Sequence, residues 1–242
     1  MKHIGLITAF LSEGTALSGI GRWSKAEGLF FRTQKLSADK TVLCVVSGMG
    51  QEQAGHGLNF LVKHGVTAIL NAGVATGLDQ TLVSGDVVLA DTIVDLGTVS
   101  SKIAPETVRI FKTIAEKKHS SLRTGKILTV TKALKTRAEK IEAYKKTGAI
   151  SADMESLWVG LEAEKHNIPF AAFRSISDEV NTTLAFDPPD MVDPFGRLRL
   201  KSFLRVIQAE PKTLFTLPGL SVGYAKSLIG LRNAWKVLLP FL

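Results

Sequence analysis

The feature that most constrains this chain is an alternation of short apolar runs with longer amphipathic stretches. The runs VLCVV at 42–46 and AAF at 171–173 are continuously apolar, which is typical of strands buried on both faces of a parallel sheet. The stretches between such runs have the length and spacing of helices. The alternation predicts an α/β fold with a mostly parallel, twisted central sheet flanked by helices.

Seven strands and four helices are expected from this pattern. The strands are Ile4–Ala9, Thr41–Ser47, Ala68–Ala72, Asp86–Val94, Gly125–Val130, Ala149–Ala152 and Phe170–Ser175. The helices are Gln51–His64, Pro105–Lys118, Lys135–Lys146 and Glu155–His166. We expect residues 1–194 to form the α/β domain and residues 195–242 to be a helical extension of the same domain.

Composition limits the class of protein. Of the 242 residues 45% are hydrophobic, enough for one full core. The single cysteine, Cys44, cannot form an internal disulfide and is expected to be a buried, inert thiol. A reducing, cytoplasmic location fits this. The N-terminal segment is predicted to be a strand and not a signal peptide, and no apolar run has the length of a transmembrane helix.

Positive charge is concentrated at the C-terminal end. Residues 195–242 contain eight basic residues and one acidic residue, a net charge of +7, whereas the rest of the chain carries +1. Charge alone is compatible with nucleic acid, an anionic membrane or solvent, and we expect no nucleic-acid partner. An apolar stripe follows helical spacing there: Leu228, Leu231, Trp235, Leu238 and Leu242.

Two interpretations of this stripe stay open. Because Lys226, Asn233 and Lys236 lie on another face, the helix has the character of one that lies on an anionic bilayer, giving a peripheral contact with the inner face of the membrane. The alternative is a helix packed on its own domain or at a subunit contact.

Several polar residues occur at predicted strand ends. They are Glu13, Ser47, Asn71, Glu155, Arg174, Ser177 and Asp178. Ligands bind at the carboxyl ends of parallel strands, so these residues form one site hypothesis. The turn Gly48-Met49-Gly50 is either a plain βα turn or a source of backbone NH groups for an anion or a ribose hydroxyl. The five histidines lack metal-ligand spacing, so neither a metal nor another cofactor is expected.

Six segments, in order, resemble the methylthioadenosine/S-adenosylhomocysteine nucleosidases of the nucleoside phosphorylase superfamily. They are IGLITAFLSE, SGMG, NAGVATGL, SGDVVLAD, SADMES and FRSISDEVN, which span Ile4 to Asn181. The NAGVATGL segment resembles a glycine-rich turn. The resemblance implies the fold of that superfamily, a homo-oligomer such as a dimer, and cleavage of the N-glycosidic bond of a purine nucleoside.

The resemblance also assigns roles. Such cleavage needs an acid for the departing base, negative charge near the ribose, and a base for water or a site for phosphate. The catalytic residues would be Glu13, which activates water, and Asp178, which protonates the purine N7. Substrate binding would fall to Val74, Ala75, Thr76, Met154, Glu155, Arg174 and Ser177, with Glu155 on the ribose hydroxyls, Ser177 orienting Asp178 and Arg174 supporting that loop. Taken singly, Glu13 is also compatible with a solvated loop carboxylate or a charge at the start of a helix, and Glu155 with a surface glutamate in a first helical turn. Asp178 is compatible with a cap and Met154 with the core.

Departures from the nucleosidase pattern point to a narrower relative. Thr76 replaces a glycine, and Leu134 falls near the place of a purine-stacking phenylalanine. The segments NAGVATGLD, SADMES, SDEVN and VDPFGR, followed by a basic end, are similar to the hopanoid-associated phosphorylases, which implies adenine release from a 5′-modified adenosine such as adenosylhopane. The alternatives are a phosphorolytic or hydrolytic enzyme of soluble nucleosides, with phosphate as a second substrate in the first case, or a non-catalytic, membrane-associated nucleoside-binding protein. The retained Glu13 favours hydrolysis.

Overall fold

The computed structural model describes residues 2–104, 107–110, 113, 116, 122–209 and 213–241. The strands are β1 Lys2–Thr8, β2 Ser24–Ala26, β3 Leu29–Lys35, β4 Lys40–Val46, β5 Ala68–Gly77, β6 Val87–Val94, β7 Ser100–Lys102, β8 Leu122–Thr129, β9 Ser151–Asp153 and β10 Phe170–Asp178. The helices are α1 Leu11–Ser18, α2 Gln51–Lys63, α4 Arg137–Thr147, α5 Ser156–Lys165, α6 Pro188–Met191, α7 Leu200–Ala209 and α8 Thr213–Leu238, followed by the 3-10 turn η1 Leu239–Phe241. The helix expected at 105–118 lies largely outside the described residues.

The strands form one sheet in the order β10-β6-β8-β9-β5-β1-β4-β3-β2, and β7 pairs with β6. Strand β10 also pairs with β5, so β5, β10, β6, β8 and β9 close into a ring. Strands β4, β1, β5 and β10 are parallel to their neighbours in this group. The predicted α/β class is confirmed. The sheet is mixed, however, because β6 runs antiparallel to β10, β9 to β5, and β3 to both β2 and β4.

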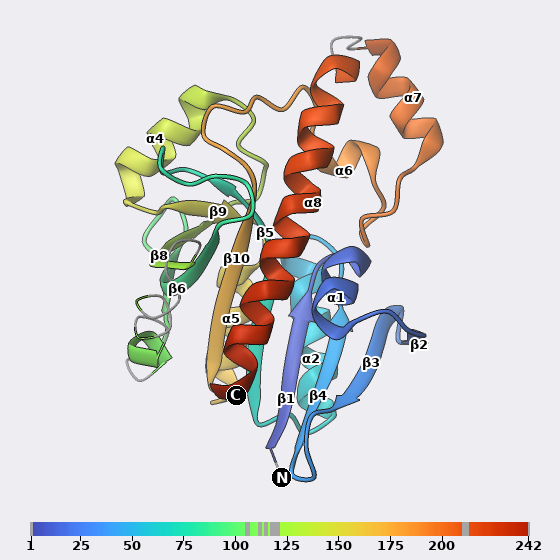
Figure 1. The fold of residues 1–242 in the computed structure, drawn as a ribbon, viewed down its shortest axis with the longest axis vertical. Coiled ribbons are helices and arrows are strands. Elements are labelled where there is room, and N and C mark those ends of the chain that lie inside the picture. The colour runs from blue at the N-terminus through green and yellow to red at the C-terminus, as the bar shows by residue number, and fades with distance from the viewer. Residues whose placement is uncertain are drawn as a thin grey trace.

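Helices cover both faces of the sheet (Figure 1). On β1 and β4, alternate residues face opposite sides: Leu6 and Cys44 join the core under α1 and α8, whereas Ile7 and Val45 join the core under α2 and α5. Burial on both sides explains the continuous apolar runs. Cys44 is a buried free thiol, and burial raises its pKa to about 12.

Strand β5 corrects one expectation. The segment resembling a glycine-rich turn, NAGVATGL, continues the strand as far as Gly77. A side chain at Gly73 would place a Cβ 3.1 Å from the Glu13 carboxylate. Glycine therefore serves close approach at this position and not a turn, and Val74, Ala75 and Thr76 are strand residues.

Helix α8 crosses the sheet in direct contact with the backbone of its neighbours. It presents Gly223 to β10, and Gly230 to β10 and to the residues just before β6. A Cβ at Gly223 would overlap the Ser177 carbonyl oxygen, and one at Gly230 would overlap the Gly85 carbonyl oxygen. Any larger side chain would separate α8 from the strand that ends in Asp178.

The apolar stripe of the C-terminal helix packs on the chain's own core. Leu231, Trp235 and Leu238 are buried in the same cluster as residues of β1, β4 and β10, and Leu228 packs against it. Leu242 lies outside the described residues. The packing interpretation is therefore the one that the structure bears out for this stripe. No helix in the described part of the chain has the length and hydropathy needed to cross a bilayer.

Candidate active site

One cavity gathers eight of the nine predicted site residues. They are Glu13, Val74, Ala75, Thr76, Met154, Glu155, Ser177 and Asp178. Because β1, β5 and β10 are parallel, the segments that follow β1, the C-terminal half of β5 and the end of β10 reach the same edge of the sheet. Met49 in the turn before α2, Leu184 and the 130–134 segment also contribute to the lining.

Glu13 enters the cavity from the first turn of α1, which follows β1 after two residues. Its carboxylate accepts hydrogen bonds from the Phe10 NH (2.8 Å), the Ala9 NH (3.1 Å) and the Val74 NH (2.9 Å). The side chain is a buried carboxylate and not a solvated one, since Glu13 is only 2% exposed. Burial raises the pKa of Glu13, opposed by these hydrogen bonds and by the charge of Arg174. A buried carboxylate is a stronger base than one in water.

Glu155 lies just before α5 and is tied to the turn at the start of α2. Its Oε1 accepts a hydrogen bond from the Gly50 NH at 2.9 Å, so the turn Gly48-Met49-Gly50 gives this NH to a carboxylate of the chain itself. Burial, followed by repulsion from the Asp153 carboxylate, raises the pKa of Glu155 to about 7. Near neutral pH this side chain can therefore hold or release a proton.

Asp178 ends β10 and is surrounded by hydrogen-bond donors. The Ser177 hydroxyl donates at 2.8 Å, the Thr76 hydroxyl lies 2.8 and 2.9 Å from the two carboxylate oxygens, and the Lys140 ammonium donates at 2.7 Å. Asp178 is 7% exposed and lines the cavity. The threonine that departs from the nucleosidase glycine therefore supplies a hydroxyl to the expected acid.

Arg174 is the predicted substrate-binding residue that does not line the cavity. It is fully buried behind it, where its Nε donates to Asp153 Oδ2 at 2.6 Å and its Nη2 to Asn71 Oδ1. Asp153 also accepts from the Thr129 hydroxyl at 2.7 Å. This buried network ties the segment that carries Met154 and Glu155 to β10. Arg174 thus lies behind the site, where it holds Asn71 and Asp153, and is not among the residues that line the cavity.

The remaining lining is mostly apolar. It includes Ala9, Phe10, Met49, Val130, Ala133, Leu134, Ala152 and Leu184. Four buried carboxylates, Glu13, Asp153, Glu155 and Asp178, thus face a pocket whose other walls are mostly apolar. This arrangement is suited to a flat heterocycle joined to a polyhydroxylated sugar.

The model of the phosphorylase superfamily matches residues 4–209. The chain belongs to the phosphorylase superfamily. The sequence predicts a nucleosidase or a phosphorylase, and membership of this superfamily confirms that class of enzyme. Helix α8 lies beyond the matched range.

Solved structures share this superfamily fold. Futalosine hydrolase of Helicobacter pylori superposes with a TM-score of 0.77 at 17% identity, over 100% of this chain and 98% of that chain. The methylthioadenosine/S-adenosylhomocysteine nucleosidase of H. pylori gives 0.77 at 18% identity, over 100% and 99%. A putative nucleosidase from Francisella philomiragia gives 0.72 at 18% identity, over 99% and 98%. None of the curated proteins matches the chain.

Sequence reasoning missed Lys140, whose ammonium touches Asp178. The residue lies in a polar helix, TRAEKIEAYKK, where one more lysine gives no signal. A partial signal is that Lys140 lies three residues before Ala143, on the same side of the helix. These two residues are the buried positions of α4.

Proposed function

We propose that this chain is a nucleosidase that hydrolyses the N-glycosidic bond of an adenine nucleoside. The observation that carries the proposal is the placement of Glu13, Glu155 and Asp178, three nearly buried carboxylates from distant parts of the chain, on one cavity. If each of these carboxylates had only a structural role of its own, the three would not need to line the same pocket.

Each carboxylate has a step in the proposed reaction. Asp178 gives its proton to N7 of the base while the glycosidic electron pair moves to the base. Glu155 binds the ribose hydroxyls and places negative charge near the oxocarbenium-like sugar. Glu13 takes the proton from the water that attacks the anomeric carbon.

Water is favoured over phosphate by the charge of the lining. None of the described residues that line the cavity is an arginine or a lysine, whereas phosphate sites rely on such side chains. The nearby Lys140 ammonium already donates to three oxygens.

The test is to incubate the protein with adenosine, methylthioadenosine and adenosylhopane, with and without phosphate, and to measure adenine and the sugar product. We expect free ribose products without any need for phosphate. Asp178→Asn should lower turnover by roughly a hundredfold to ten-thousandfold while the circular dichroism spectrum is unchanged. Ribose 1-phosphate formed only with phosphate present would overturn hydrolysis, and an active Asp178→Asn would overturn the site assignment.

For the substrate we propose a 5′-modified adenosine with an apolar 5′ group, such as adenosylhopane, taken from a membrane surface. Support comes from the apolar lining and from α7, none of whose residues is buried. Leu198, Leu200 and Leu204 are 57%, 65% and 52% exposed. The segment 194–209 carries four basic residues and no acidic one: Arg197, Arg199, Lys201 and Arg205. An exposed, amphipathic, basic helix is complementary to an anionic bilayer.

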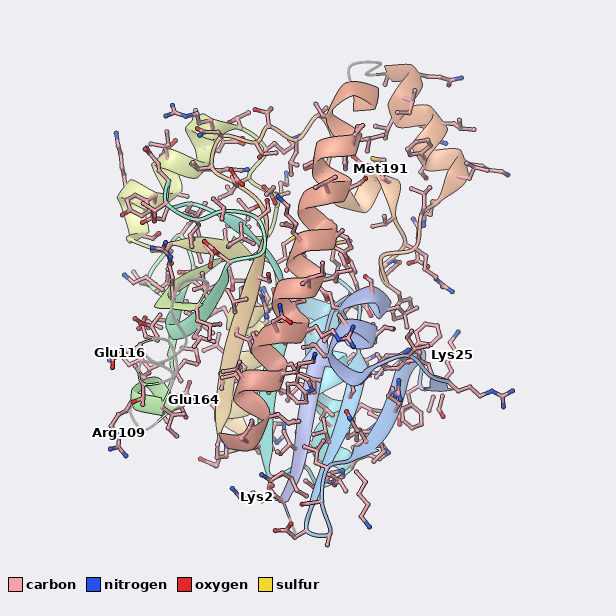
Figure 2. All side chains as sticks on the ribbon, viewed as in Figure 1. Lys2, Lys25, Arg109, Glu116, Glu164 and Met191 are labelled. Atoms are coloured by element: carbon pink, nitrogen blue, oxygen red, sulfur yellow. The ribbon has the colours of Figure 1, made fainter. Side chains whose placement is uncertain are left out.

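The chain that leads into α7 adjoins the cavity. The Pro194 carbonyl accepts from the Met49 NH at 3.0 Å and the Phe195 carbonyl from the Leu11 NH at 3.2 Å. The buried Met191 of α6 lies near α7 (Figure 2), and its carbonyl accepts from the Arg199 NH at 2.9 Å. A membrane bound by α7 would therefore lie near the lining residues Phe10 and Met49.

Sedimentation with vesicles tests this contact. We expect binding to anionic vesicles and not to neutral ones, weakened by salt, and abolished in Leu200→Asp/Leu204→Asp. The matched control is Val222→Asp/Ile229→Asp, which alters two exposed apolar residues of α8. Hydrolysis of soluble methylthioadenosine should be unchanged in both variants, so failure of this contact leaves the proposed reaction intact. Equal binding by the two variants, or no binding by the wild type, would refute the membrane contact.

A homodimer is part of the proposal and is tested by light scattering.

A further inference from the structure

Lys140 is a fully buried cation held by three oxygens. Its ammonium donates to Asp178 Oδ2 at 2.7 Å, to the Glu179 carbonyl at 2.9 Å and to the Thr182 carbonyl at 2.8 Å, and its exposed fraction is 0%. An ammonium has three N–H donors, so all of them are used. The charge is fixed in position and in direction.

Holding the loop after β10 in place does not by itself require a buried cation with three oxygen partners. Lys135, just before α4, reaches the same region through Asp187 at 3.2 Å, and both side chains of that pair are about 40% exposed. That pair tethers the loop without touching Asp178. Burying a cation carries a desolvation cost, which a neutral donor to the two carbonyls would avoid. The charge of Lys140 is therefore best explained by its carboxylate partner.

We propose that Lys140 is a positioning residue for Asp178, an inference that rests on the proposed function. When the proton of Asp178 passes to the departing base, the bond between the anomeric carbon and the base breaks, and Asp178 becomes a carboxylate. Lys140 keeps its own protons, fixes the orientation of the carboxyl group and stabilises the negative charge as it forms. Because that charge is larger in the transition state than in the bound substrate, the effect falls on kcat and not on KM.

A double-mutant cycle tests the assignment. Lys140→Met should lower kcat for adenine release by roughly tenfold to a hundredfold, the size expected for a charge-assisted hydrogen bond, with KM changed by less than about twofold. In an Asp178→Asn background the same change should cost nothing further, because no charge then develops beside it. Lys140→Arg should restore part of the rate. Lys135→Met is the matched control and should keep nearly the wild-type rate.

A tether alone would give a different result. Lys140→Met would then lower the rate by the same factor in the wild type and in the Asp178→Asn background, or raise KM with little change in kcat, and either outcome overturns the inference. If Lys140→Met does not fold, the cycle is run with Lys140→Gln, which keeps a donor for the carbonyls. A wild type that releases no adenine from any nucleoside refutes the proposed function instead, whereas an active wild type with an inactive Asp178→Asn and an unaffected Lys140→Met refutes only the role of Lys140.

Discussion

At the scale of single residues, Glu155 combines a role in the proposed reaction with a cost in stability. Its pKa is raised to about 7, by burial first and then by the Asp153 carboxylate. In the unfolded chain the carboxyl has its ordinary pKa near 4.5. Between these two values the folded protein binds more protons than the unfolded chain, so the contribution of Glu155 to stability falls as pH rises through this window and is level above it.

Glu155→Gln should therefore be more stable than the wild type in alkaline solution and less active. The gain in the free energy of unfolding should be small near pH 4.5 and reach about 3 kcal/mol at most at pH 8, at about 1.4 kcal/mol per unit of pKa. Turnover should fall because the charge near the ribose is lost. Urea unfolding at several pH values, with an adenine-release assay, measures both. A stability difference that does not vary with pH would contradict the shifted pKa.

Part of the site follows from sequence reasoning at this same scale. Glu13, Glu155 and Asp178 follow predicted strands. Parallel pairing of β1, β5 and β10 brings Glu13 and Asp178 to one edge, whereas Glu155 reaches it from β9, which pairs antiparallel with β5. The position of Arg174 behind the cavity does not follow, because its partners Asn71 and Asp153 are 103 and 21 residues away. Lys140 and Asp178 are 38 residues apart and come from a helix and a strand with no shared motif.

At the scale of elements, the contact of α8 with β10 depends on glycine. Gly223→Ala would drive a methyl group into the Ser177 carbonyl oxygen. Because both atoms belong to the backbone or lie next to it, the helix must shift, at a cost of about 1–3 kcal/mol. Ser177 precedes Asp178, so turnover should fall as well.

Gly219→Ala is the control for this prediction. It lies in the same helix, and a Cβ there meets no atom within 4 Å. The change should leave turnover intact and stabilise the protein by up to about 1 kcal/mol, since alanine favours a helix. Thermal unfolding and the activity assay compare the two variants. Equal behaviour would show that α8 does not rest on Ser177 as described.

Elements with a strong pattern were predicted from the sequence to within a few residues, and the weak ones were missed. Strand β4 is a continuous apolar run, and helix α2 has its apolar residues at helical spacing. The hairpin β2–β3 was missed because its strands are half-buried and its turn uses Glu27 and Gly28, both at positive φ. Helix α1 was missed because it has eight residues and little amphipathicity. Strand β5 extends past its apolar run because pairing with β10 continues to Thr76, a tertiary effect that local sequence does not encode.

At the scale of the whole molecule, the C-terminal helix belongs to the core. Trp235 is 4% exposed within a cluster that includes Leu6, Val42 and Phe173. Trp235→Ala should cost about 3–5 kcal/mol of unfolding free energy, whereas Ile229→Ala, which alters a residue that is 61% exposed on the same helix, should change it by less than about 0.5 kcal/mol. Differential scanning calorimetry distinguishes them. A small effect at Trp235 would mean that α8 is a detachable appendage.

The position of α8 also affects how the protein is made. Glu13 leaves the ribosome early, and the strands that carry the other carboxylates follow, but the face of the sheet under α8 stays open until residues 213–238 have been synthesised. Only then can the Tyr224 hydroxyl form its 2.6 Å hydrogen bond with the hydroxyl of Ser12, next to Glu13. Only then, too, can Gly223 pack against Ser177, next to Asp178. A nascent chain therefore contains all three carboxylates before α8 can pack beside two of them, Glu13 and Asp178.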